Sequence, residues 1–182
     1  MKTFIKILVL TLFSISTSYS QEKYFTNAGF ISFFSHSPLE DIKAENEQVL
    51  SVFDSKTNEL VIYVLMKSFI FEKALMQEHF NENYVESDKF PKAIFKGKVN
   101  NIDINKTTAQ SVNLVGSLTI HGKTNDVNTE AEFLFTKEVV KLKGTFDVLV
   151  ADYDIRIPRT VINNIAKTIE ISFNLDQKPY TN

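Results

Sequence analysis

Apolar and polar residues alternate along most of this chain, and a period of two is typical of β-strands that bury one face and expose the other. The clearest run is 110–120, where Val112, Leu114 and Leu118 share a face opposite mostly polar residues. Seven further strands are expected at 30–35, 39–53, 60–68, 93–99, 129–135, 140–148 and 169–175. The inward faces of the segments 30–35 and 60–68 stay ambiguous, because their apolar residues fall on both faces.

Residues that favour tight reversals separate these segments, so successive strands are expected to pair as antiparallel hairpins. The expected turns lie at 54–59, 100–107, 121–128 and 136–138. One segment departs from the alternation: residues 70–78 contain good helix formers, with Phe71, Leu75 and Met76 along one stripe. A second helical turn is expected over 158–166, because a proline suits the first helical position.

About eight antiparallel strands and one short helix predict an all-β, mainly antiparallel fold. A barrel is favoured, because closure removes exposed strand edges. An eight-stranded barrel is either filled by side chains or holds one small ligand. The small residues Gly97, Gly116, Ala131 and Gly144 fall on inward faces and are expected to leave room. Since no charged residue faces inward on the five clearest strands, an apolar chain can enter without stranding a buried ion.

The first 20 residues have the pattern of a secretory signal peptide. Lys2 and Lys6 form a basic head, residues 7–13 are apolar except for one threonine, and Ser18 and Ser20 supply small residues two apart. Cleavage is therefore expected before Gln21, which leaves 21–182 as a single domain. The sequence predicts a periplasmic or secreted protein with no transmembrane segment in its mature form.

Composition narrows the function further. The chain has 182 residues, of which 43% are hydrophobic and 23% charged, with a net charge of -2. This balance gives no basic excess for a nucleic-acid partner. The absence of cysteine excludes a disulfide framework, a thiolate nucleophile and a cysteine-ligated zinc. The chain has 16 Phe and 6 Tyr but only 5 Gly, so the fold must enclose many bulky apolar side chains.

Catalytic and metal-binding patterns are not evident in the sequence. His36, His79 and His121 are far apart along the chain, without the short spacing of a preformed metal site. No acid-base pair falls on an inward face. We therefore expect no catalytic residue, no metal and no cofactor, which favours a binding protein over an enzyme.

Two segments resemble the motifs of a known family. The first is Phe80, a polar gap and then Lys89-Phe90-Pro91-Lys92-Ala93-Ile94-Phe95-Lys96-Gly97, and the second is Gly116-Ser117-Leu118-Thr119-Ile120-His121-Gly122-Lys123-Thr124. Together they resemble the YceI-like family of exported, lipocalin-like proteins, over most of 29–175. The resemblance implies an eight-stranded lipocalin-like β-barrel with a short helix covering one end. It also implies an interior that holds a long polyisoprenoid chain, without a known catalytic activity.

These observations lead to a hypothesis about the ligand and its site. The partner is expected to be an isoprenoid or other long-chain apolar lipid, of polyprenol or quinone type. Alternation places the barrel-wall residues, while the helix and the first family motif place those near the mouth. The expected ligand-binding residues are Phe95, Leu114, Leu118, Phe133, Phe146 and Phe173 on the wall and Phe71, Leu75 and Phe80 at the mouth.

Two alternatives stay open at this stage. One is an enzyme or isomerase that acts on an isoprenoid-like lipid in the same cavity. The other is a stress-response barrel whose interior is filled and which binds no ligand. The sequence also leaves open which lipid is bound and whether the protein forms a homodimer.

Overall fold

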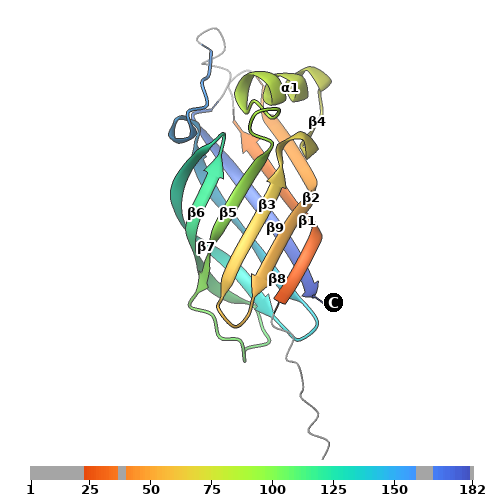
Figure 1. Cartoon of the computed structure of the whole chain (residues 1–182), viewed down its shortest axis with the longest axis vertical. Helices are drawn as coiled ribbons and strands as arrows, with labels where there is room; N and C mark the ends of the chain where they lie inside the picture. Colours follow the sequence, from red (N-terminus) through yellow and green to blue (C-terminus); the bar gives the residue numbers. More distant parts are fainter. Residues whose placement is uncertain (1–22, 37–39, 159–165, 181–182) are drawn as a thin grey trace, which may run out of the picture.

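Strands form where the alternation predicts them, and together they enclose a barrel (Figure 1). The computed structural model describes residues 23–36, 40–158 and 166–180. The long strands are β1 (Lys23–Ser35), β2 (Ile42–Asp54), β3 (Glu59–Leu65), β5 (Lys92–Asn100), β6 (Gln110–Ile120), β7 (Lys123–Phe135), β8 (Val140–Leu149) and β9 (Thr168–Pro179). The shorter elements are η1 (Met66–Ser68), β4 (Ile70–Phe71), α1 (Ala74–His79), η2 (Phe80–Tyr84) and η3 (Val150–Tyr153).

The eight long strands close into one antiparallel barrel. Their order is β1-β9-β8-β7-β6-β5-β3-β2, and pairing of β1 with β2 completes the ring. β4 extends the edge of β2 beyond the end of β3, next to α1. The predicted fold class is therefore confirmed. Among the described residues, no helix has the length and apolar character needed to cross a membrane.

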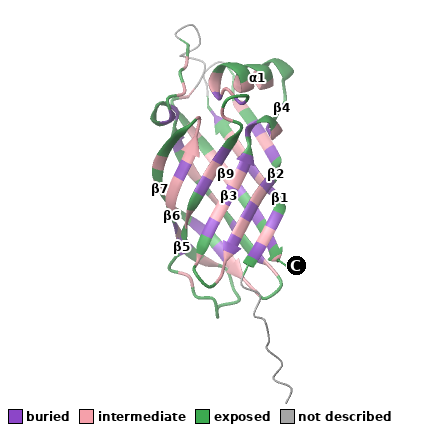
Figure 2. Ribbon diagram, in the orientation of Figure 1, coloured by how far each residue is buried: buried purple, intermediate pink, exposed green. Residues whose placement is uncertain are grey.

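The inward faces predicted for the clear strands are the observed ones. On β7, Phe133 is 0% exposed. Its neighbour Glu132 lies on the outer face and forms an ion pair with Lys143 of β8, at 3.0 Å. Figure 2 shows the same alternation of buried and exposed residues along the other strands.

The ambiguous face of the first strand has a structural cause. The register of β1 against β2 shifts between Thr26 and Gly29, and again between Gly29 and Ile31. Such bulges move the inward set from even to odd positions, so Thr26 and Ile31 are both buried. On β3 the pattern is regular, and the buried residues are Leu60, Ile62 and Val64.

The helix is shorter than predicted and begins later. Ile70 and Phe71 form β4, paired with β2 at Glu45 and Ala44. A β-branched and an aromatic residue suit a strand edge, and this pairing overrides the helical pattern. α1 then begins at Ala74 and passes into the single π-helical turn η2.

The turn predicted at 121–128 is also shorter. His121 and Gly122 alone connect β6 to β7, with φ of 50° and 76°. Two positive φ values are typical of the tight hairpin turn that matches strand twist. A Cβ on Gly122 would lie 2.6 Å from the Phe90 ring, so glycine is also needed there for space. The predicted signal peptide and most of the predicted helical turn at 158–166 lie outside the described residues.

One end of the barrel is filled by side chains. This closed end carries the β2–β3 and β7–β8 turns, and its inward residues are almost completely buried. The apolar ones include Tyr24, Phe53, Leu60, Val99, Val112, Phe133, Val140, Leu142 and Leu175. Aromatic rings meet there edge to face, as Phe53 and Phe133 do with ring centroids 5.4 Å apart. The interior is therefore packed in this half, and any ligand must lie in the other.

Candidate binding cavity

The half of the barrel nearest α1 contains a cavity of about 280 Å³. This volume lies just below the usual range for small-molecule sites, about 300–1,000 Å³. All eight long strands contribute to the wall, and its side chains are overwhelmingly apolar. The polar residues of the described lining are Ser35, His79, Tyr84 and Thr129. The described lining contains no carboxylate, lysine or arginine, so it suits a hydrocarbon better than a charged ligand.

The segment 66–85, here called the lid, crosses this end of the barrel and contributes eight lining residues. They are Met66, Phe69, Phe71, Met76, His79, Phe80, Tyr84 and Val85. Phe80 is the centre of an aromatic cluster, because its ring lies 5.1 to 5.7 Å from those of Phe33, Phe69 and Phe71. Phe33 belongs to β1, so this cluster fixes the lid to the barrel wall.

Seven of the nine predicted ligand-binding residues line this cavity. They are Phe71, Phe80, Phe95, Leu114, Leu118, Phe146 and Phe173. Whether they contact a ligand stays a prediction.

Two predicted residues lie elsewhere. Leu75 is 61% exposed on α1, and its helical neighbour Met76 faces the cavity instead. The later start of the helix explains this, since it changes which residues share a face with Phe71. Phe133 points inward as predicted but lies in the packed closed end. Alternation gives the face of a strand residue and not its depth along the barrel axis.

Other lining residues were not predicted. Ile31 and Phe33 come from β1, whose face was ambiguous in the sequence because of its bulges. Phe69 and Met66 come from the irregular segment between β3 and β4. Ile155 and Ile157 follow η3, where the sequence shows no regular pattern. These residues could have been suspected from the sequence only because they are apolar and lie in irregular segments next to the ends of strands.

The predicted small inward residues do not line the cavity. Gly97 lies directly opposite Gly116 across the β5–β6 ladder. A Cβ on Gly116 would lie 2.4 Å from the backbone oxygen of Lys96. The two glycines therefore allow close approach of two backbones, rather than leaving room for a ligand. Ala131 and Gly144 lie next to the packed end, and the small apolar residue of the described cavity wall is Ala93.

Tyr84 is the clearest polar anchor in the wall. Burial raises the pKa of its phenol above the ordinary value of 10.0, so the hydroxyl stays protonated at neutral pH. Together with His79 it places hydrogen-bonding groups on the lid side of an otherwise apolar cavity. Such an arrangement can bind a chain by its apolar surface and orient one polar end at the lid.

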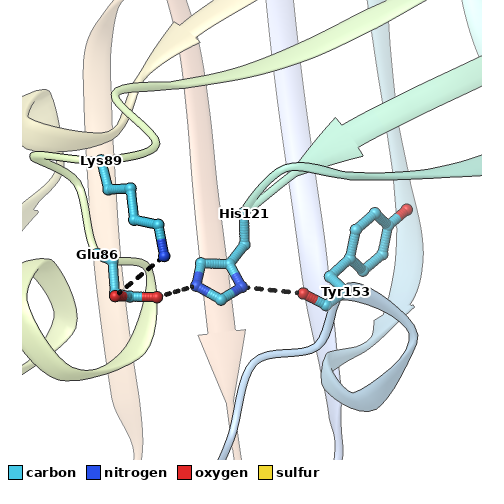
Figure 3. Close-up of polar contacts among 4 residues, drawn as sticks. All are labelled: Glu86, Lys89, His121 and Tyr153. Carbon is cyan, nitrogen blue, oxygen red and sulfur yellow. Dashed lines mark hydrogen bonds and ion pairs between the residues drawn. The ribbon is translucent and has the colours of Figure 1, made fainter.

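A polar latch joins the lid to two other connections at the same end (Figure 3). Its centre is His121 in the β6–β7 turn, whose side chain is 11% exposed. Nε2 lies 2.8 Å from a carboxylate oxygen of Glu86, directly after the lid, and Nδ1 lies 3.1 Å from the backbone oxygen of Tyr153 in η3. Both partners are hydrogen-bond acceptors, so the two ring nitrogens of His121 join the two connections. Lys89 approaches the other Glu86 oxygen at 3.9 Å.

The latch predicts a defined pH dependence of stability. The hydrogen bond from His121 holds the pKa of the Glu86 carboxyl below its ordinary value of 4.5. A lowered folded-state pKa stabilises the fold above 4.5, and this contribution is lost as pH falls through the folded-state value. We therefore expect Glu86→Gln to reduce the free energy of unfolding at neutral pH but to have little effect well below 4.5. Urea unfolding at both pH values tests this, and an equal loss at both would contradict it.

The histidines occupy separate environments. His36 pairs with Asp41 at 2.8 Å, His79 lines the cavity, and His121 holds the latch. Within the part of the chain that the structure describes, no group of three His, Asp or Glu residues is placed to hold a metal ion.

Comparison with known proteins identifies the family. Residues 25–177 match the YceI-like domain. No curated protein sequence matches the chain.

Solved structures share the fold at low sequence identity. A polyisoprenoid binding domain from Saccharophagus degradans, implicated in plant cell wall breakdown, is 12% identical, with a TM-score of 0.74 over 87% of this chain and 99% of its own. BcnA of Burkholderia cenocepacia is 14% identical, with a TM-score of 0.68 over 81% and 95%. A YceI protein of Campylobacter jejuni is 17% identical, with a TM-score of 0.60 over 81% and 90%. Since the family match spans most of the sequence and the barrel agrees with it, the chain belongs to the YceI-like family.

Proposed function

We propose that this protein is an exported carrier that holds the hydrocarbon chain of an isoprenoid lipid, of polyprenol or quinone type, inside its barrel. The observation that carries the proposal is the cavity under the lid, with its almost wholly apolar wall. The Saccharophagus degradans relative, which is described as a polyisoprenoid binding domain, supports the same class of ligand.

The free energy of such binding depends mainly on the apolar surface area that the ligand buries. Burying one CH₂ group contributes about 0.8 kcal/mol, so a chain of several isoprene units can bind tightly without specific polar contacts. The wall has no charged group among its described residues, so little polar desolvation opposes this gain. Selectivity for the polar end of the lipid then depends on Tyr84 and His79.

The cavity also bears on the alternatives. A barrel filled throughout would show the close packing of the closed end in both halves. An enzyme needs convergent acid and base groups at the reacting atom, and the wall offers one phenol and one imidazole among apolar residues. Membership of the YceI-like family likewise favours a binding protein.

Export is part of the proposal. The basic head, apolar stretch and small residues of 1–20 favour secretion, with the mature chain beginning at Gln21. A periplasmic or secreted carrier meets its lipid in a compartment where a free isoprenoid is insoluble in water. N-terminal sequencing of the exported protein tests this step, and a mature chain that still begins at Met1 would contradict it.

Lipid content tests the binding function directly. The full chain is produced with its leader, purified without detergent and extracted with organic solvent, and lipid per mole of protein is measured by mass spectrometry. We expect close to one isoprenoid lipid per protein. Protein stripped of lipid is expected to gain melting temperature when a polyprenol or a quinone is added, since a ligand that binds only the folded state stabilises it. Protein with no bound lipid and no such gain would exclude the carrier function.

A further inference from the structure

The ladder between β7 and β8 is the shortest of those that close the barrel. It consists of four residue pairs, from Glu132 with Lys143 to Phe135 with Val140. By contrast, β6 pairs with β7 from Gln110 to Ile120, and β8 pairs with β9 along its whole length. Residues 123–131 of β7 and 144–149 of β8, all within the described part of the chain, pair with β6 and β9 but form no ladder with each other. We call this part of the wall the β7–β8 seam.

The seam is bounded at both ends. At its lower end stands the ion pair of Glu132 with Lys143, on the last rung of the ladder. At its upper end η3 packs against the start of β7, where the Asn125 amide donates to the backbone oxygen of Asp152 at 2.8 Å. The latch to Tyr153 closes the same corner (Figure 3).

Between these ends the two strands are joined weakly. The hydroxyl of Thr129 lies 3.4 Å from the backbone oxygen of Thr145, at the long limit of a hydrogen bond. Gly144 lies close to β7, since a Cβ there would be 3.2 Å from the backbone oxygen of Glu130. A side-chain contact thus replaces the regular ladder immediately above the last rung.

The seam separates the cavity from a hollow on the outer surface. Val127 and Thr129 line the cavity on the β7 side, and Phe146 and Val148 line it on the β8 side. The outer hollow is lined by residues of β6, β7, β8 and β9 and by Phe30 of β1, and it too reaches Thr129 and Phe173. Two inward-facing side chains therefore border both spaces, so the wall is a single layer of side chains at this point.

We propose that the β7–β8 seam is a lateral entrance through which the apolar chain of the ligand passes between the outer surface and the cavity. This inference rests on the proposed carrier function. The next shortest ladder is that of β2 with β3, with five residue pairs, and β4 pairs with the edge of β2 beyond it. A chain that passed through any of the other ladders would have to break their backbone hydrogen bonds. At the seam the strands separate without that cost, and apart from Thr129 the side chains that border the passage on the cavity side are apolar.

The chain offers a clean way to close the seam. It contains no cysteine, so an introduced pair is the only thiol pair present. Extending the register of Glu132 with Lys143 places Asn128 opposite Asp147, and both are exposed on the outer face. The variant Asn128→Cys with Asp147→Cys is bridged by a bifunctional methanethiosulfonate and reopened by reduction. The matched control is Ser117→Cys with Asp126→Cys, which bridges a pair already within the β6–β7 ladder.

The readout is the rate at which stripped protein takes up a fluorescent polyprenol analogue from phosphatidylcholine vesicles. We expect the bridge across the seam to slow uptake by about tenfold or more, as an added barrier of ~1.4 kcal/mol does. Reduction should restore the rate, and the bridged control should load like wild type. A monofunctional methanethiosulfonate on the same cysteines adds similar bulk without joining the strands. It therefore shows whether bulk alone slows lipid uptake. Glu130→Cys with Thr145→Cys, one step nearer the ladder, provides a second closure.

The outcomes separate the two proposals. If wild type takes up no lipid, the carrier function fails and the entrance fails with it. If wild type loads but both bridged seam variants load at the same rate as their reduced forms, the lateral entrance is wrong and the carrier function stands. In that case the lipid must pass the lid end of the barrel instead.

Discussion

Phe133→Ala is expected to lower the free energy of unfolding by about 3–5 kcal/mol, the usual cost of removing a fully buried phenylalanine. Phe133 is 0% exposed, and its ring packs between Phe53 and Phe135 in the closed end. Truncation leaves a void that these neighbours fill only in part. Phe133→Asp should be more severe, because it also buries a carboxylate without a partner. Urea unfolding followed by circular dichroism measures both changes.

Two control variants make this prediction specific. Phe146→Ala should cost clearly less than Phe133→Ala, because Phe146 is only partly buried and already borders the cavity. Glu132→Ala should change stability by no more than about 1 kcal/mol, since it removes an exposed ion pair with Lys143. Equal losses for Phe133→Ala and Phe146→Ala would show that the two ends of the barrel are packed alike, against the division described above.

The strands could be predicted because alternation is a local consequence of pleating. Every second side chain of a strand faces the core, so Phe95, Leu118 and Phe173 were placed inward without knowledge of their neighbours. Antiparallel order followed from short turns between consecutive strands. The same argument cannot give depth along the barrel axis, which is why Phe133 was grouped with residues of the cavity wall.

Features that depend on pairing between distant segments were missed. The β1 bulges are visible only against β2, and they invert the face that alternation suggests. Ile70 and Phe71 read as the start of a helix, but a free edge on β2 makes them a strand. Because α1 therefore begins only at Ala74, Leu75 lies on the exposed face of the helix. Local sequence carries no signal for an unoccupied strand edge that lies 25 residues upstream, where Glu45 meets Ile70.

The latch was beyond sequence reasoning for a related reason. Glu86, His121 and Tyr153 lie in three different connections between strands, so no short spacing links them. Closure of the barrel brings these connections to one end, and only then does His121 meet two acceptors. The glycine pair at 97 and 116 shows the same limit, because a small inward residue can serve a ligand or a backbone contact. Which of these two roles a small residue has depends on the residue opposite it on the neighbouring strand.

Ala93→Phe is expected to remove most of the bound lipid. Ala93 lines the cavity from β5, opposite Val64 of β3, and a benzyl group there takes up space in a volume of about 280 Å³. Forcing both ring and ligand into this space should cost about 1–3 kcal/mol, which weakens binding by roughly 5- to 160-fold. The matched control is Ile94→Phe, because Ile94 follows on the same strand with its side chain on the opposite face. Lipid per mole of folded protein, measured by mass spectrometry, should fall for Ala93→Phe and stay at the wild-type value for Ile94→Phe. If the two variants retain equal lipid, the cavity under the lid is not the binding site.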